Sequence, residues 1–295
     1  MRIVAMRQMR RWMSTNSAKW AALVEVPSPR KKTSAKRYDD EDPGKHIVSL
    51  EHGTNKVRGI GIVDAHELFA NLPFGEAVDV PNTQKAVVRL PVRLPELCGG
   101  MLRGAQTISA KDAGLIIARL GIGRSDRVLE AGLGSGGLAL HISRCLGKDG
   151  LHITVEPRDE HAAIGLANLE RGADSWVDGP AHHHVHGSLE ESVDQVATHA
   201  AEYDAIVLDL PNHEAAVAAA APLLTVGGRL ACYCPVTSQV EAAWTACESA
   251  GLSVEWAGEL MERRWGRASK GGIRPINGSL GHTAFLLIAQ RRAVV

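Results

Sequence analysis

Three glycines at the end of an apolar run have the spacing of a ligand-binding turn. Val128 and Leu129 close the run. Gly132, Gly134 and Gly137 follow with the pattern G-x-G-x-x-G, after which LALHISRCL has a helical period. Glycines at a strand-to-helix turn let backbone N–H groups approach a nucleotide-like ligand, because no Cβ holds the ligand off. A Gly-rich turn that binds nothing has the same pattern, so a second feature is needed.

An acidic residue at the expected distance supplies that feature. Glu156 ends the next apolar run, LHITVE, and an acid about 20 residues after such a turn meets ribose hydroxyls in this kind of fold. Two ligand classes fit. A dinucleotide places its pyrophosphate on the helix N-terminus, whereas S-adenosylmethionine has no phosphate and needs a ribose-binding acid and a cradle for its amino-acid end.

A second acid follows a later strand. Asp209 ends the apolar run of AIVLDLPNHE, and Pro211 breaks the chain two residues later. Ligands in open α/β sheets bind beyond the carboxyl ends of the strands. We therefore expect Asp209 at the reactive end of the ligand, with an N-cap for the next helix as the alternative interpretation.

The elements that position these residues alternate between strand and helix. Ser109 can cap a first helix that extends to residue 120. The predicted order is then strand 127–131, helix 136–146, strand 151–155, helix 159–170, strand 182–186, helix 188–200, strand 203–209, helix 213–224, strand 228–234 and helix 238–250. This alternation indicates a parallel sheet with helices on both faces.

The C-terminal part departs from the alternation. Segments 252–260 and 282–290 are predicted strands without a helical pattern between them, so we expect an antiparallel hairpin at one edge. Seven strands with such a hairpin resemble the Rossmann-like sheet of class I methyltransferases. An oxidoreductase is disfavoured because a second mononucleotide-binding half is missing.

The N-terminal part has a different character. Short apolar segments separated by Gly, Asn and Pro predict a small β domain over residues 46–98, and residues 99–295 form the α/β domain. Residues 1–45 are predicted to be a disordered basic tail. Its Arg-rich opening resembles a transit peptide, and Met13 as the true start is an equally consistent interpretation, which would exclude residues 1–12.

Charge is unevenly distributed although the formal net charge is zero. Residues 1–38 carry a net charge of +9 and residues 262–295 a net charge of +6, so the middle carries −15. Basic ends suggest contact with RNA or DNA, and a solvated tail is the alternative. No apolar run is long enough to span a membrane. Five scattered cysteines without CxxC spacing fit a reducing cytoplasm.

Two further clusters are interpreted as structural. Cys232 and Cys234 fall on one side of a predicted buried strand and are expected in the core. The histidines of HHHVH alternate between the two faces of a strand, so no metal site is predicted. They are His182, His183, His184 and His186.

Several motifs together resemble the tRNA (adenine-N1)-methyltransferases that modify position 58, and in archaea often 57, of the T loop. The resemblance covers about residues 46–292. It rests on RGAQTISAKDAG (103–114), VLEAGLGSGGLAL (128–140), VEPRDEH (155–161), VLDLP (207–211) and GHTAFLLI (281–288). The combination of EAGxGSGG with the terminal GHTAFL is more specific than the glycine turn alone.

The resemblance implies a role for each matching residue. The turn would cradle the methionine part of S-adenosylmethionine through Gly134, Ser135, Gly136, Gly137 and Leu138. Glu156 would accept the ribose hydroxyls, His161 would lie beside the adenosine, and Ser188 and Leu189 would line the adenine. Asp209 would be the active-site acid, which holds the amino edge of the target adenine while N1 attacks the methyl group. The family also implies a homotetramer.

The chain departs from the family pattern at three places. Ser109 stands where an aromatic residue or His is common, and the segment after Pro211 lacks the usual Trp, so stacking surface for a flipped adenine is missing. Ser188 stands where several relatives have an acid. Trp265 with Arg263, Arg264 and Arg267 is expected to bind RNA, because aromatics among arginines suit single strands; packing between domains is the alternative for Trp265.

Taken together, the sequence predicts an S-adenosylmethionine-dependent methyltransferase that acts on N1 of adenine 58, 57 or both in tRNA. Two alternatives stay open. The chain could be a non-catalytic RNA-binding partner subunit with the same fold, which the presence of Glu156 and Asp209 disfavours, or a methyltransferase acting on another substrate.

Overall fold

The computed structural model describes residues 18–26, 38–39, 44–268, 271–276 and 281–293. The chain forms two compact units. The N-terminal unit consists of Met1–Met101, Glu170–Val177 and Trp265–Arg274, and the sheet unit consists of Leu102–Leu169, Asp178–Arg264 and Pro275–Val295. All residues predicted to bind the cofactor belong to the sheet unit.

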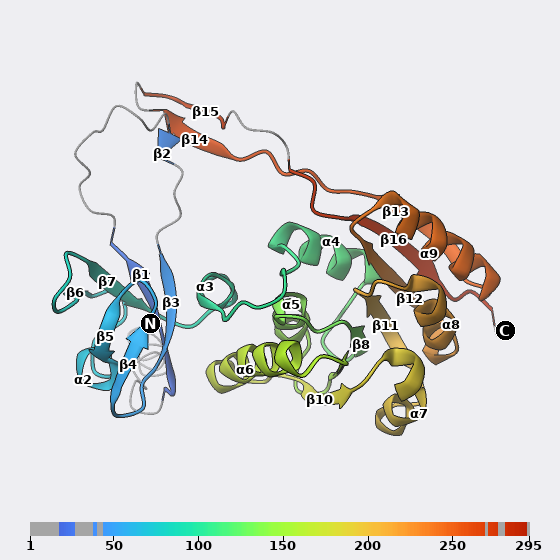
Figure 1. The fold of residues 1–295 in the computed structure, drawn as a ribbon, viewed down its shortest axis with the longest axis horizontal. Coiled ribbons are helices and arrows are strands. Elements are labelled where there is room, and N and C mark those ends of the chain that lie inside the picture. Colours follow the sequence, from blue (N-terminus) through green and yellow to red (C-terminus); the bar gives the residue numbers. More distant parts are fainter. Residues whose placement is uncertain (1–17, 27–37, 40–43, 269–270, 277–280, 294–295) are drawn as a thin grey trace, which may run out of the picture. The chain divides into compact units, whose positions relative to one another are not determined.

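A large β-sheet forms the centre of the sheet unit (Figure 1). In spatial order its strands are β10 (Ala181–His186), β9 (Leu151–Glu156), β8 (Arg127–Ala131), β11 (Tyr203–Leu208), β12 (Leu224–Cys234), β16 (Phe285–Gln290) and β13 (Ser253–Gly258). The first five are parallel, and β16 runs antiparallel between β12 and β13. The predicted seven-stranded sheet with an antiparallel end is confirmed.

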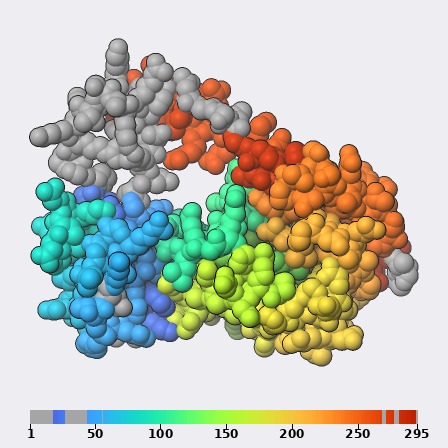
Figure 2. Space-filling model, viewed as in Figure 1, coloured from blue at the N-terminus to red at the C-terminus, as the bar shows by residue number. Residues whose placement is uncertain are grey.

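Helices cover both faces of this sheet. The helices α4 (Ala110–Leu120) and α5 (Gly137–Cys145) pack on one face, and α7 (Leu189–His199), α8 (His213–Ala220) and α9 (Thr237–Ser249) pack on the other, where they form an outer surface (Figure 2). Strand side chains alternate between the layers: Leu129 joins the α7–α9 core, and its neighbour Val128 joins the α4–α5 core. The strands are therefore apolar on both faces.

Local sequence signals set several boundaries. Ser109 caps α4, as predicted, because its side chain accepts a hydrogen bond from the N–H of Asp112. The helix predicted over 213–224 ends earlier, at Ala220, and a 3₁₀ turn η1 (Ala221–Leu223) follows. Pro222 has no N–H to continue the α-helical ladder. Cys232 and Cys234 lie in the core, as predicted.

The N-terminal unit is mainly β structure. A four-stranded antiparallel sheet has the spatial order β3 (Lys45–Ser49), β1 (Trp20–Glu25), β7 (Ala86–Leu90), β6 (Ala77–Asp79). The hairpin of β4 (Thr54–Val57) and β5 (Gly61–Asp64), with the helices α2 (Ala65–Phe69) and α3 (Leu94–Gly100), completes its main body. A further sheet has the order β15 (Ile273–Pro275), β14 (Trp265–Ala268), β2 (Tyr38–Asp39).

The structure corrects the predicted extent of the N-terminal tail. Residues 20–25 were assigned to the tail but form β1, which pairs with both β3 and β7. Leu23 is fully buried in the core of this sheet. Basic composition obscured a short apolar run, AALV, whose burial stabilises the strand. Most of the remaining tail, at 1–17, 27–37 and 40–43, lies outside the described residues.

Within the described ranges, no helix is long and apolar enough to cross a membrane.

Candidate cofactor and active site

The glycine turn has positive φ angles at three of its glycines. It joins β8 to α5, and Gly132, Gly134 and Gly136 have φ angles of 98°, 51° and 78°. A Cβ on Gly132 would lie 2.2 Å from the carbonyl oxygen of Asp209. Glycine at position 132 is therefore required both by its φ angle and by the close approach of the neighbouring strand end.

The turn is supported by segment 102–105 and by Asn168, a residue that the sequence analysis did not identify. The Oγ of Ser135 donates a hydrogen bond of 2.7 Å to the carbonyl of Ala105, and the N–H of Gly104 donates to the same Oγ. Asn168 is fully buried on α6 (Asp159–Ser175), and its Nδ2 donates to the carbonyls of Leu102 and Ser135, both at 2.9 Å. Segment 102–105 therefore supports the turn.

Glu156 lies at the end of β9 with its carboxylate buried. Its Oε2 accepts a hydrogen bond from the N–H of Gly134 at 3.0 Å, and its Oε1 accepts one from Nε of Arg158 at 2.8 Å. Burial raises the pKa of Glu156, but the hydrogen bonds from Arg158 and Gly134 more than offset it, so the pKa lies below its usual value. Glu156 is therefore a charged acceptor directly beside the turn.

Asp209 follows β11 at the adjacent strand end. Its N–H donates a hydrogen bond of 2.9 Å to the carbonyl of Ala131, which places it against the glycine turn. Burial, followed by the nearby negative charge of Glu130, raises its pKa to about 7, and Arg158 acts in the opposite direction. Asn212 is the N-cap residue of α8, so the alternative role of Asp209 as that cap is excluded.

Tyr233 is an aromatic neighbour of the acid that the sequence analysis missed. It lies near the end of β12 and is buried, and Thr283 forms a hydrogen bond with it. Burial, with the charges of Asp112 and Asp209, raises its pKa to about 12, so the phenol keeps its proton. The only sequence signal was an aromatic residue within the apolar run ACYC.

Lys111 links three segments beside Tyr233. Its Nζ donates to Oδ1 of Asp112 at 2.6 Å, to the carbonyl of Leu260 at 2.7 Å and to Oγ1 of Thr283 at 2.7 Å. Asp112 is fully buried and also accepts from Oγ of Ser109. The first turn of α4 is thereby tied to the segments that follow β13 and precede β16.

The remaining predicted cofactor residues lie at the N-terminal ends of α5, α6 and α7. His161 lies in the first turn of α6, and its buried Nδ1 has no hydrogen-bond partner among the described residues. Ser188 is the N-cap residue of α7, and its Oγ donates to Glu191. The side chains of Leu138 and Leu189 are buried in the cores, so only their backbones remain for a ligand.

These residues fit S-adenosylmethionine. The left-handed glycines leave the space that a Cβ would fill, a buried carboxylate lies beside them, and the unpartnered Nδ1 of His161 offers a polar contact for the adenosine. The set lacks the second nucleotide-binding half that a dinucleotide would use.

A buried polar cluster lies beneath this site. Nε2 of His152 lies 3.0 Å from Oε2 of Glu130, and Ser143 bonds to the other ring nitrogen. Burial lowers the pKa of His152 to about 3 and raises that of Glu130 well above its usual value. His182 and His184 both bond to Thr154, and His183 stacks on His199. In the described part of the chain no group of side chains could hold a metal ion.

The predicted RNA-binding residues lie at the start of β14. The side chain of Trp265 is 64% exposed, so it is available for stacking. Arg267 lies on the same strand, which pairs with β2, and Arg263 and Arg264 precede it in the chain.

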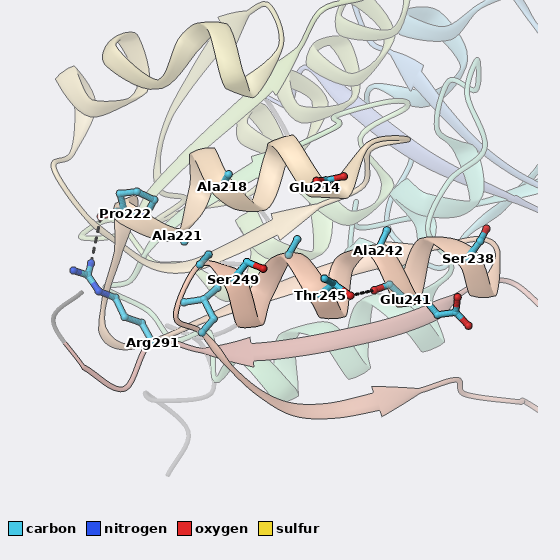
Figure 3. A pocket seen from close by; sticks show the side chains of 13 residues that line it. Glu214, Ala218, Ala221, Pro222, Ser238, Glu241, Ala242, Thr245, Ser249 and Arg291 are labelled. Atoms are coloured by element: carbon cyan, nitrogen blue, oxygen red, sulfur yellow. Dashed lines mark hydrogen bonds between the residues drawn. The ribbon is translucent and has the colours of Figure 1, made fainter.

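A groove of about 810 Å³ runs between α8 and α9 on the outer surface of the sheet unit (Figure 3). Small side chains form much of its floor, and Glu214, Glu241 and Arg291 stand along it. It contains none of the residues predicted to bind the cofactor or RNA.

Comparison with known proteins agrees with the geometry. Residues 90–266 match the family described as "tRNA methyltransferase complex GCD14 subunit". The chain is 31% identical over 212 residues to "tRNA (adenine(57)-N(1)/adenine(58)-N(1))-methyltransferase TrmI" of Methanocaldococcus jannaschii, a match covering 64% of this chain and 73% of the relative. It is 34% identical over 227 residues to "tRNA (adenine(58)-N(1))-methyltransferase TrmI" of Thermus thermophilus, covering 77% and 85%.

Two solved structures share the fold. A SAM-dependent O-methyltransferase from Thermotoga maritima superposes with a TM-score of 0.72 at 23% identity, covering 95% of this chain and 96% of the other. The tRNA (m1A58) methyltransferase TrmI from Aquifex aeolicus gives a TM-score of 0.63 at 19% identity, covering 93% and 97%. On the sequence matches, this chain belongs to the GCD14 family of tRNA methyltransferase subunits, the family to which its motifs point.

Proposed function

We propose that this chain is an enzyme that methylates N1 of an adenine in tRNA, with S-adenosylmethionine as the methyl donor. The observation that supports this function best is the placement of Glu156 and Asp209 at the ends of β9 and β11, the two strands that flank β8 and its glycine turn. The curated relatives in M. jannaschii and T. thermophilus, named for this reaction, support it independently.

Glu156 and the turn bind the cofactor. Glu156 accepts the ribose hydroxyls, the backbone of residues 132–138 cradles the methionine part, and His161, Ser188 and the backbone of Leu189 surround the adenosine. When bound, S-adenosylmethionine supplies an activated methyl group that N1 takes by direct in-line displacement. Positioning and electrostatics therefore provide most of the rate.

Asp209 acts on the target base. Its carboxylate accepts a hydrogen bond from the exocyclic amino group of the adenine and so orients N1. The methylated base carries a positive charge, and a buried carboxylate at its amino edge stabilises that charge as it develops. Ser109 and the segment after Pro211 supply no aromatic surface for the base, and Tyr233, on the strand next to Asp209, is buried in the core.

Arg263, Arg264, Trp265 and Arg267 bind the tRNA. The arginines contact phosphates, and the exposed Trp265 stacks on an unpaired base. The T loop is the target region, and adenine 58, adenine 57 or both are modified. Cytoplasmic location, expected from the cysteine pattern, and a homotetramer, expected from the family resemblance, stay predictions; light scattering on the purified chain tests the second.

Methyl transfer from labelled S-adenosylmethionine to unmodified tRNA transcript tests the function, with the product nucleoside identified by mass spectrometry. N1-methyladenosine is expected. S-adenosylmethionine binding without methylation of tRNA would instead support a non-catalytic partner subunit or another substrate. Asp209→Ala is the matched control, because it should bind the cofactor and give no product.

A further inference from the structure

The carboxylate of Glu156 has all its acceptor positions in use. A carboxylate has about four lone-pair positions on its two oxygens. Oε1 accepts from the backbone N–H of Arg158 at 3.2 Å and from its Nε at 2.8 Å. Oε2 accepts from the N–H of Gly134 at 3.0 Å and from Nη2 of Arg158 at 3.4 Å. Two hydroxyl donors cannot be added without loss of two of these bonds.

The four donors differ in how easily they can leave. The two backbone donors are fixed, because one belongs to the glycine turn and the other to the chain just after β9. The guanidinium belongs to a flexible side chain that is 61% exposed. We propose that the Arg158 side chain is a displaceable counterion, which occupies the ribose position of Glu156 and must move away when the cofactor binds. This inference rests on the proposed function, in which Glu156 receives the ribose.

The charge of the ligand determines how easily it displaces the Arg158 guanidinium. Without ligand, Arg158 supplies the positive charge next to two acids, Glu156 and Asp209. The sulfonium of S-adenosylmethionine brings a positive charge that can replace it. The demethylated product, S-adenosylhomocysteine, has no sulfonium, so the guanidinium competes with it more effectively. Arg158 therefore acts against product retention, in addition to shielding Glu156 before the cofactor binds.

Calorimetric titration with S-adenosylhomocysteine at pH 8 tests the inference. This probe carries no net charge, so removal of a distant positive charge has little effect on its affinity. Arg158→Met removes the guanidinium, which donates two hydrogen bonds to Glu156, and keeps a side chain of similar length. We expect S-adenosylhomocysteine to bind this variant roughly three- to fivefold more tightly, because displacing a partly exposed ion pair costs about that much affinity. Arg158→Lys keeps the positive charge but has no planar guanidinium, so its affinity for S-adenosylhomocysteine should lie between those of Arg158→Met and the wild type.

Arg119→Met is the matched control, because Arg119 is in the same unit but stacks on Trp256. It should bind S-adenosylhomocysteine as the wild type does. Unchanged or weaker binding by Arg158→Met would overturn the inference, since the guanidinium would then be neutral or a ligand contact. If the wild type itself does not bind S-adenosylhomocysteine, both the proposed function and the inference fail. If wild type and Arg158→Met bind it equally well, only the inference fails.

Discussion

The backbone N–H of Gly134 donates a hydrogen bond of 3.0 Å to the carboxylate of Glu156. The two residues come from different βα units, so this bond couples the glycine turn to the neighbouring strand end. The bond fixes the backbone of the turn relative to the carboxylate, so a ligand that binds to Glu156 also contacts the turn. This coupling explains why the turn and the acid act as one binding site.

Activity should be lost as the pH falls through about 7. The pKa of Asp209 is raised to about 7, so below that pH the carboxyl group is protonated and has no negative charge with which to stabilise the positive charge of the methylated base. The kcat/KM for S-adenosylmethionine reports the free enzyme and should decrease in this range. Asp209→Asn should retain cofactor binding and lose at least ~100-fold in turnover. Equal turnover by Asp209→Asn and wild type would remove Asp209 from the mechanism.

The same shift predicts a pH-dependent stability difference. Because the carboxyl group binds its proton more tightly in the folded than in the unfolded chain, folding stability attributable to Asp209 decreases as pH rises from about 4 to about 7. Asp209→Asn lacks this ionisation. Urea unfolding at pH 5 and pH 8 should show the variant gaining stability relative to wild type at pH 8. A constant difference would mean that the pKa is not raised.

Gly132→Ala should damage both stability and activity. The added Cβ meets the Asp209 carbonyl oxygen at 2.2 Å, and the φ angle of 98° is unfavourable for alanine. We expect the variant to unfold at a lower temperature and to lose cofactor binding. Gly114→Ala is the control: Gly114 lies within α4 with nothing near its Cβ position, so alanine there should stabilise by about 0.5–1 kcal/mol. Identical melting temperatures for the two variants would contradict this explanation.

Lys111→Met should destabilise the sheet unit by about 1–3 kcal/mol. It leaves buried Asp112 without its cation and removes the donor to Leu260 and Thr283. Denaturant unfolding measures the loss. Lys148→Met, at an exposed loop position, should change stability by less than about 0.5 kcal/mol. If both variants unfold alike, the Lys111 network has no stabilising role.

Much of the fold follows from local pattern. The strands that carry the site are apolar on both faces and alternate with helices, so their order and the turn at residues 132–137 could be predicted. Glu156 and Asp209 could be found because each ends an apolar run. These signals are visible in short windows of sequence.

The supporting residues could not be found in this way. Asn168 bonds to Leu102, and Lys111 bonds to Thr283, across long sequence separations that no local pattern encodes. The sequence analysis did not single out Tyr233, because an aromatic residue in a buried strand usually packs in the core. The strand β1 was missed for a different reason, since the basic residues around it suggested a tail while only a short apolar run, WAALV, indicated a strand.

Trp265→Ala should weaken tRNA binding through lost stacking, by about 1–3 kcal/mol, with little change in salt dependence. Arg267→Gln should instead lower the salt slope by about one. Filter binding over a range of salt concentrations separates the two effects. Ile273→Ala is the control, because Ile273 is an exposed apolar residue of the same small sheet. A similar loss for Ile273→Ala would show that Trp265 acts only through surface area.

The most direct test of the central claim is methylation of matched tRNA transcripts that differ only at positions 57 and 58. The account predicts N1-methyladenosine from the transcript with adenines in the T loop, mapped by primer-extension arrest, and none when both adenines are replaced. Equal amounts of N1-methyladenosine from both transcripts would contradict the account. So would the absence of N1-methyladenosine from both transcripts if the protein binds S-adenosylmethionine.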